Sequence, residues 1–468
     1  MEKGFYDTLS DYCHGDMLPM HMPGHKRNKK FSMENPYGID VTEVTGMDDL
    51  HCPEGVIREM MDKATAMYGS DQSYLLVNGS TCGILSAITA CCRCGDRILV
   101  ARNCHKAVYN AIRLLELRPL YVLPDGDGGD MEHLGIPGSV RAEEIERILE
   151  EYRDISCVVL TSPTYEGIVS PIREIAEVVH RSQIPLIVDE AHGAHFNWHK
   201  SFPDTALTEG ADIVIESLHK TLPSFTQTGI LHARYGLADR ERLEWSLQTY
   251  QSSSPSYLLM AGIDRCFAYI ENEGGEDFEK YVENLRAFSE KMNCLEHLYL
   301  FGSDHKEASK IVIATDRTEI TGKELADILR EQFRIETEMN CGDYCIAMTS
   351  VADEKSSFDR LGDALKKIDA GLGLSAYGQN PGFQYVWNIP ETGLYSYEAA
   401  AREREKVPVK SAEGRMAAED IYLYPPGVPF VVQGEILSRE ILAHILDGEK
   451  AGYRLHGVRD GFVNVIRP

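Results

Sequence analysis

No apolar run in this 468-residue chain approaches the roughly 20 residues that a membrane-spanning helix needs. The stretch from Met1 to Tyr12 is too acidic and too polar for a secretory signal, and no internal repeat of the solenoid kind is present. These absences predict a globular protein of the cytoplasm without a membrane partner. The length is sufficient for two or three domains.

Basic residues are in deficit, with 47 Lys and Arg against 73 Asp and Glu and a net charge of −26. Binding to phosphate backbones depends on clustered Lys and Arg that release counterions, so the deficit predicts that nucleic acid is not a partner. An acidic surface suits cationic small molecules, and it serves solubility equally well.

Cysteine spacing gives no sign of a metal site. The twelve cysteines are scattered and often stand beside apolar residues, as small core residues do in a reducing compartment. Cys341 and Cys345 have no second Cys/His pair close behind them. The acidic string DGDGGD, Asp125 to Asp130, has glycine at a ligand position of a calcium loop, so we expect an exposed turn and no metal.

Short β-branched runs alternate with stretches of helical periodicity over the first half of the chain. The runs predict strands at 73–77, 98–101, 119–123, 157–160, 185–188, 213–215 and 229–233, the last at a sheet edge, and helices at 58–68, 81–94, 105–115, 141–152 and 172–180. Ser80 or Thr81 is expected to cap the second helix. Such alternation predicts an α/β fold with a largely parallel sheet covered on both faces by helices.

The pattern changes after a long helical stretch at 261–293. A strand at 310–314, a helix at 322–333, a hairpin around 336–348 and a helix at 357–372 predict a smaller α+β unit. Residues 375–410 are rich in loop signals and lead to a final unit. We therefore expect an N-terminal arm at 1–50, a large domain at 51–275, a small domain at 276–375 and a C-terminal domain at 376–468.

Polar side chains follow two neighbouring buried strands. Asp189 ends the strand at 185–188, and Lys220 comes just after the strand at 213–215. Ligands of parallel sheets bind at these strand ends. Lys220 is either a surface anchor or an amine held for covalent chemistry. A turn NGST at Asn78 to Thr81 and His105 in NCHK favour the second reading, because pyridoxal phosphate needs a lysine, a carboxylate, hydroxyls at a helix N-terminus and a flat side chain over its ring.

Eight strings along the chain resemble the bacterial ornithine/lysine/arginine decarboxylases: MHMPGHK (Met20 to Lys26), DVTEVTGMDDLHCPEG (Asp40 to Gly55), NGSTCG (Asn78 to Gly83), NCHK (Asn103 to Lys106), SPTYEG (Ser162 to Gly167), VDEAHGAHF (Val188 to Phe196), ESLHKTLP (Glu216 to Pro223) and YPPGVPFVVQGE (Tyr424 to Glu435). They run in the family's order over nearly the whole chain. The resemblance implies a fold-type-I, aminotransferase-like architecture with a seven-stranded, mostly parallel sheet and smaller C-terminal α+β domains.

The resemblance also implies a role for each matching residue. Lys220 would bond to the aldehyde of the cofactor, Asp189 would hold the proton on its pyridine nitrogen, and His105 would cover its ring. Ser80, Thr81 and Ser217 would bind the phosphate, His219 would flank the phosphate or the lysine, and His192 and Thr164 would lie near the cofactor. Burial of Lys220 would help it to provide a neutral amine.

Two further positions bear on the substrate and on assembly. Glu435 resembles a family position near the distal end of the substrate, where a carboxylate suits an ammonium or guanidinium group; an exposed glutamate is the alternative. The segment QSSSP, Gln251 to Pro255, resembles one that reaches the phosphate of the neighbouring subunit. A homodimer, or a higher homo-oligomer built from dimers, is therefore expected.

The resemblance favours decarboxylation of a basic L-amino acid in polyamine metabolism. Arginine, giving agmatine, comes before lysine to cadaverine and ornithine to putrescine, because the chain lacks the receiver-like N-terminal domain of the long inducible enzymes and resembles the short arginine type. An aminotransferase or lyase of the same fold is an alternative, although only Arg454, Arg459 and Arg467 are candidates to grip a carboxylate. A cofactor-binding regulator is a third reading, but no basic DNA-binding helix pair is evident.

Three positions depart from the family pattern. Met47 replaces a more usual leucine, Glu166 stands where tyrosine or aspartate is common, and Gln433 stands where proline is frequent. Glu166 and Gln433 could alter the substrate pocket, so the choice among the three basic amino acids stays open at this point.

Overall fold

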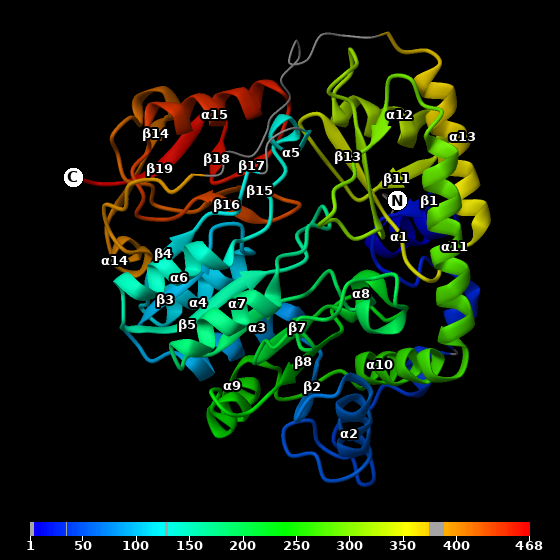
Figure 1. The fold of residues 1–468 in the computed structure, drawn as a ribbon, viewed down its shortest axis with the longest axis horizontal. Helices are drawn as coiled ribbons and strands as arrows, with labels where there is room; N and C mark the ends of the chain where they lie inside the picture. Colours follow the sequence, from blue (N-terminus) through cyan, green and yellow to red (C-terminus); the bar gives the residue numbers. More distant parts are fainter. Residues whose placement is uncertain (1–3, 34, 127–129, 374–387) are drawn as a thin grey trace.

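The protein folds around a seven-stranded sheet (Figure 1). The structure is a computed structural model that describes residues 4–33, 35–126, 130–373 and 388–468. The strands lie in the order β2 (Gln72–Leu76), β8 (Gly229–Ala233), β7 (Ile213–Glu216), β6 (Leu186–Asp189), β5 (Ile155–Thr161), β3 (Arg97–Ala101) and β4 (Arg118–Val122). All adjacent pairs from β7 to β4 are parallel, so the predicted α/β fold class is confirmed.

The expectation that 229–233 forms an edge strand is wrong. Strand β8 lies between β2 and β7 and is antiparallel to both. All five of its residues are buried, as expected of a strand whose backbone is paired on both sides. The edges of the sheet are β2 and β4.

Two groups of helices pack against this sheet. One group joins α3 to α4 and α9, with α3 also contacting β7 and β8, and the other joins α6 to α7, which contacts β6. The helices of the large unit are α2 (Val56–Tyr68), α3 (Gly79–Cys91), α4 (Lys106–Leu114), α5 (Asp130–Leu134), α6 (Ala142–Glu151), α7 (Ile172–Arg181), α8 (Leu218–Thr221), α9 (Arg240–Tyr250) and α10 (Tyr257–Tyr269). Burial of each Val, Ile or Leu side chain between these layers contributes about 1.5–3 kcal/mol.

Helix α3 differs from its prediction at both ends. It begins at Gly79 and ends at Cys91, three residues before the predicted end. Its N-cap is Asn78, without a side-chain cap bond, so neither Ser80 nor Thr81 caps it. The hydroxyl of Ser80 instead lies 2.6 Å from that of Ser217.

A second unit lies at the upper right of Figure 1, around α12 and α13. Its four-stranded antiparallel sheet has the order β12 (Met339–Cys341), β13 (Tyr344–Met348), β10 (Lys310–Ala314) and β9 (Tyr299–Leu300). Its helices are α11 (Gly275–Met292), α12 (Gly322–Phe333) and α13 (Lys355–Asp369). The predicted hairpin is the β12–β13 pair, and a π-helical turn at 270–274 joins α10 to α11 in the predicted long helical stretch.

The N-terminal residues contribute to this second unit. Helix α1 (Phe5–His14) is followed by β1 (Leu18–Met20), which pairs in parallel with β11 (Ile335–Thr337). Beyond β1, the backbone N–H of Gly24 donates to the carbonyl of His219 at 2.6 Å. A Cβ on Gly24 would lie 2.6 Å from the carbonyl oxygen of Leu222, so only glycine allows this approach.

The C-terminal unit, orange to red in Figure 1, contains two three-stranded sheets. One has the order β14 (Arg404–Pro408), β19 (Phe462–Ile466) and β18 (Val458–Arg459), and the other β16 (Val428–Val431), β15 (Ile421–Leu423) and β17 (Leu455–His456). Its helices are α14 (Ser396–Ala400) and α15 (Arg439–Lys450). The expected domain boundaries stay a prediction.

Parts of two sequence expectations lie outside the described residues. These are positions 127–129 of the DGDGGD string and positions 374–387 of the loop-rich segment. Asp130 is the first residue of α5. No helix in the described ranges is long and apolar enough to cross a membrane.

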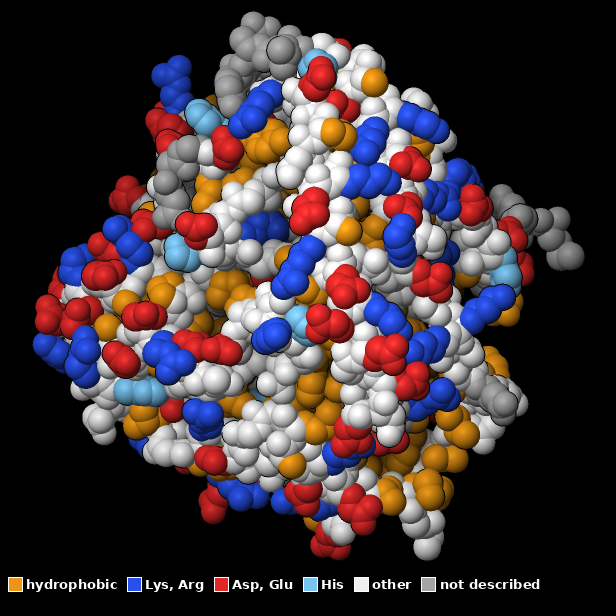
Figure 2. Space-filling model, turned by 45° about the vertical axis from the view of Figure 1, so that its right-hand side comes forward, with side chains coloured by type: hydrophobic (Ala, Val, Ile, Leu, Met, Phe, Trp, Pro, Cys, Tyr) orange, Lys and Arg blue, Asp and Glu red, His pale blue; other side chains and the backbone are white. Residues whose placement is uncertain are grey.

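The surface of the molecule carries acidic side chains interspersed with basic ones (Figure 2). On the helices of the second unit these form ion pairs, as between Lys291 of α11 and Asp359 of α13 at 3.3 Å. Exposed pairs of this kind contribute at most about 1 kcal/mol each, so they serve solubility more than stability.

Candidate active site

The candidate site lies where β6 and β7 end side by side. Asp189 is the last residue of β6 and pairs in register with Ile215 of β7. Ser217 follows β7 directly, and Lys220 lies on the short helix α8 after it. The polar residues are brought together here because parallel strands direct their carboxyl ends to one edge of the sheet.

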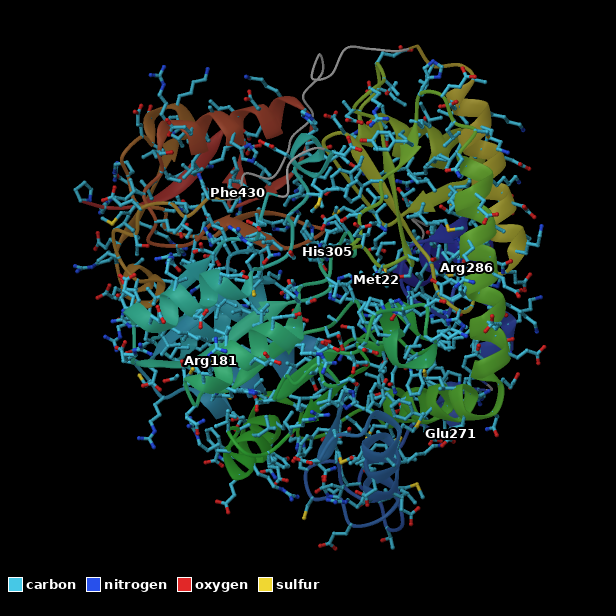
Figure 3. All side chains as sticks on the ribbon, in the orientation of Figure 1. Met22, Arg181, Glu271, Arg286, His305 and Phe430 are labelled. Carbon is cyan, nitrogen blue, oxygen red and sulfur yellow. The ribbon has the colours of Figure 1, made fainter. Side chains whose placement is uncertain are left out.

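These residues line a cavity of about 240 Å³. Nine of the ten site residues singled out in the sequence contribute to its wall: Ser80, Thr81, His105, Thr164, Asp189, His192, Ser217, His219 and Lys220. Met22, which lies near the centre of the molecule in Figure 3, lines it as well. The tenth residue, Glu435, does not line it.

Lys220 is partly buried and lies beside a histidine. Its Nζ lies 3.0 Å from Nε2 of His192. Burial lowers the pKa of Lys220 to about 8, against an opposing attraction from Asp189. Burial and the neighbouring Lys220 hold the pKa of His192 well below its usual range, so this imidazole is neutral and can accept a hydrogen bond from the lysine. A neutral lysine amine is therefore accessible near physiological pH.

Asp189 provides the negative charge of the site. Its side chain is 3 % exposed, and Oδ1 accepts the backbone N–H of Ala191 at 3.2 Å. Burial raises the pKa of Asp189, and the charge of Lys220 opposes the rise. A cation brought next to Asp189 would stabilise its ionised form in the same way.

One end of the cavity suits a phosphate group. The hydroxyls of Ser80 and Ser217 meet at 2.6 Å, next to the first turn of the 13-residue helix α3. The free N–H groups and the dipole of a helix N-terminus attract anions. Nδ1 of His219 lies 2.8 Å from the carbonyl oxygen of Thr228, which leaves Nε2 as its other hydrogen-bonding atom.

His105 begins helix α4. Its Nδ1 accepts the backbone N–H of Ala107 at 3.3 Å, so the ring is the N-cap and its orientation is fixed. Burial, followed by the charge of Lys220, lowers the pKa of His105 to about 3. A neutral, oriented ring on the cavity wall is suited to stacking on a flat ligand.

Glu435 is instead held in a separate ion pair. Its Oε2 lies 2.9 Å from the Arg102 guanidinium and accepts the N–H of Val432 at 2.6 Å. Both partners are almost fully buried. Glu435 belongs to the lining of another cavity, of about 290 Å³, together with Tyr121 and Gln433. The contact of Glu435 with the substrate therefore stays a prediction. The position of Glu435 outside the cavity does not support it.

The segment QSSSP lies beside the start of α3. The N–H of Ser252 donates to Oδ1 of Asn78, and the Gln251 side chain accepts the N–H of Val77 at 2.9 Å. Ser252, Ser253 and Ser254 are exposed. Their predicted contact with a neighbouring subunit stays a prediction.

Sequence reasoning missed residues that reach the cavity from distant segments. Asn103 and Tyr165 line it from loops after β3 and β5, and Tyr424 to Pro426 line it from the C-terminal unit. Glu166, which the sequence had named as a position that could alter the substrate pocket, lines it too. All of these residues stand inside the sequence strings that resemble the family. Their place in those strings was the signal that could have identified them as cavity residues. Glu338 and Lys310 had no such signal, although both affect the pKa of Lys220 through their charges.

Two family models together match most of this chain. The family described as "Orn/Lys/Arg decarboxylase, major domain" matches residues 3–359, and "Orn/Lys/Arg decarboxylase, C-terminal domain" matches residues 392–460. The arginine decarboxylase of Bacillus subtilis (strain 168) is 30% identical over 481 residues, covering 100% of this chain and 97% of the relative. An uncharacterized protein of the same organism, YaaO, is 35% identical and covers 94% and 93%.

The fold is also shared with a solved structure. The constitutive lysine decarboxylase of E. coli superposes with a TM-score of 0.77 at 19% identity, covering 99% of this chain and 82% of that chain. Identity this low shows the fold alone. It agrees with the aminotransferase-like, fold-type-I architecture expected from the sequence.

Proposed function

Because the chain belongs to the Orn/Lys/Arg decarboxylase family and is thus an amino-acid decarboxylase that uses pyridoxal phosphate, we propose that its preferred substrate is L-arginine. The products are then agmatine and carbon dioxide. The observation that carries the proposal is the full-length similarity to a relative named arginine decarboxylase. Lysine and ornithine come next as substrates.

The residues present fit the cofactor. The cavity offers the amine of Lys220, a buried carboxylate on Asp189 and two hydroxyls at a helix N-terminus. Two buried polar atoms in its lining residues, Nδ1 of His192 and Oδ1 of Asn103, have no hydrogen-bond partner among the described residues. Unpartnered buried polar atoms are costly unless a ligand satisfies them.

Each residue then has a defined task. Lys220 would hold the cofactor covalently, Ser80, Thr81 and Ser217 would bind its phosphate with the amides of α3, and His219 would flank them. Asp189 would keep the pyridine nitrogen protonated, and His105 would cover the ring. When bound, pyridoxal phosphate supplies the electron acceptor that takes up the electron pair left by departing carbon dioxide.

Decarboxylation consumes one proton, because the carboxylate is replaced by hydrogen on the α-carbon. When its amine is free, Lys220 can hold a proton within the cavity, in a hydrogen bond from Nζ to Nε2 of His192 at 3.0 Å. The Pro425–Pro426 segment and Val428 close one wall with apolar surface. A poorly hydrated wall favours loss of the carboxylate charge as neutral carbon dioxide.

The setting of the enzyme is part of the proposal. We place it in polyamine metabolism in the cytoplasm, acting as a homodimer in which the exposed serines of QSSSP reach the partner's phosphate site. The support is the exposure of Ser252, Ser253 and Ser254 next to the start of α3. Analytical ultracentrifugation of the holoenzyme, with Ser253→Glu as the variant, tests it: dissociation with loss of cofactor affinity is expected, whereas an active monomer would contradict the dimer.

A substrate panel tests the activity. The holoenzyme is given arginine, lysine and ornithine separately, carbon dioxide is measured and the products are identified by mass. Release of carbon dioxide with agmatine as the fastest product is expected. Keto acid without carbon dioxide would identify an aminotransferase, and no turnover with bound cofactor would overturn the proposed function.

A further inference from the structure

Resting on the proposed function, we infer that Glu166 is the carboxylate that binds the positively charged end of the substrate side chain. It is one of the positions at which the sequence departs from the family pattern. The inference replaces Glu435, the residue that the sequence had suggested for this contact.

Glu166 lies in the wall of the same cavity as Lys220. It follows β5, whose end is adjacent to that of β6, and its side chain is 4 % exposed. Oε1 accepts the hydroxyl of Tyr344 at 3.0 Å, and Oε2 accepts the hydroxyl of Thr164 at 3.0 Å. The two hydroxyls come from different units of the molecule and hold the carboxylate in place.

The charges of the cavity wall leave Glu166 without a cation. Among the described lining residues, Lys220 is the one lysine or arginine, and Asp189 and Glu166 are the two carboxylates. Asp189 and Lys220 attract one another. No ion pair involves Glu166 in the described part of the chain, and burial raises its pKa. Lys306 attracts it more weakly and donates instead to the carbonyl oxygen of Glu307 at 3.0 Å.

Glu166 also retains hydrogen-bonding capacity. A carboxylate offers about four acceptor positions, and the two hydroxyl donors use one on each oxygen. An ammonium or a guanidinium group carries the donors that would fill the remainder and supplies the missing positive charge. An uncharged side chain would leave the buried carboxylate unpaired.

Two other glutamates are less suitable. Glu435 already pairs with Arg102 and lines a different cavity. Glu338 accepts the N–H of Met22 at 2.8 Å and the hydroxyl of Tyr165, and it does not line the cavity. Glu166 is therefore the carboxylate with both cavity access and no charged partner within the described residues.

The first experiment compares Glu166→Gln with the parent holoenzyme. The amide keeps the size of the side chain and removes its charge. We expect KM for the cationic substrate to rise by about 10- to 100-fold, the range for a hydrogen bond to a charged group, with a smaller change in kcat. Glu166→Asp should recover part of the loss. Glu174→Gln, on the exposed face of α7, is the matched control and should leave both constants unchanged.

The second experiment measures binding without turnover. Agmatine, cadaverine and putrescine are titrated as inhibitors or by calorimetry, together with norleucine, which has the amino-acid end but no side-chain charge. Glu166→Gln should weaken the amines by about 10- to 100-fold and change norleucine by less than about 2-fold. Equal losses for amines and norleucine, or unchanged amine binding, would overturn the inference.

The two proposals fail in different ways. If the parent enzyme releases carbon dioxide from none of the three amino acids, the proposed function is wrong, whereas amine binding still tests Glu166. If the parent enzyme decarboxylates arginine and Glu166→Gln has an unchanged KM, the function stands and the inference about Glu166 is wrong.

Discussion

The carboxyl ends of β6 and β7 have two sides, one facing the cavity and one facing away from it, and the two sides differ in their charges. On the cavity side, Asp189 faces the cation Lys220 and a ligand space. On the other side, Glu190 and Glu216 are 2 % and 1 % exposed. Alternate residues of a strand point to opposite faces, so neighbours in the chain serve different environments.

The second side holds two acids in contact. Glu190 Oε1 accepts the N–H of Ala206 at 2.8 Å, and Glu216 Oε1 lies 3.8 Å from Nε2 of His232. Burial and the charge of Glu216 raise the pKa of Glu190 well above its usual value. The protonated form of Glu190 is therefore favoured on this side, while the cavity side presents separated charges.

The largest effect is expected on the cavity side from Lys220→Ala. Loss of the amine should remove the visible absorbance of the lysine-bound cofactor and lower turnover by at least about 10³-fold. Absorbance spectra and carbon dioxide release measure both. Lys106→Ala is the control: its Nζ lies 3.5 Å from the hydroxyl of Tyr422, so the absorbance should stay. If the band persists in Lys220→Ala instead, another lysine holds the cofactor.

Asp189→Ala should have the next largest effect. The protein should stay folded, and kcat should fall by about 10²- to 10³-fold, as expected if the carboxylate raises the pKa of the pyridine nitrogen by about two to three units. Circular dichroism and steady-state kinetics test this. Near-normal turnover would show that the pyridine nitrogen has another partner. The carboxylate of Asp189 would then not distinguish the cavity side from the other side in catalysis.

Glu435→Gln extends the comparison to a buried acid that lies on neither side of the β6 and β7 strand ends. Removing the charge that faces Arg102 should lower the free energy of unfolding by about 3 kcal/mol and leave KM for the substrate unchanged. Denaturant unfolding and kinetics give the two numbers. A raised KM with normal stability would instead support the substrate role first suggested by the sequence.

The last variant, Glu190→Gln on the side opposite the cavity, is expected to change only the pH dependence of stability. Since its folded pKa is raised, the parent protein loses stability as pH rises from about 4.5 toward that pKa, by up to about 1.4 kcal/mol per pH unit. The amide cannot ionise, so the variant should become more stable relative to the parent between pH 5 and 8. Thermal melts across this range measure the difference; parallel curves would show that Glu190 is ionised in the folded protein.

Local sequence patterns predicted much of the fold and part of the candidate site. Runs such as Ile213–Ile215 predicted strands because β-branched residues in short buried stretches have few alternatives, and the strand ends placed Asp189 beside Lys220. The insertion of β8 between β2 and β7 was not predictable, because pairing partners depend on tertiary arrangement.

The same limit applies to the side chains. The pairing of Glu435 with Arg102 joins residues 333 positions apart, and no local pattern encodes such a contact. Glu166 could be recognised as unusual from the sequence, but its exact surroundings, with Tyr344 178 positions away, depend on how two units pack. Long-range contacts of this kind determine which acids are available to a ligand.

The amide of Gly24 holds the backbone beside Lys220, and Met22 forms part of the cavity wall. Proteolytic nicking or a bulky affinity tag placed near β1 would therefore damage catalysis before it damaged solubility. Preparations that look intact on a sizing column could still be inactive, so purification strategies are better designed around the other terminus.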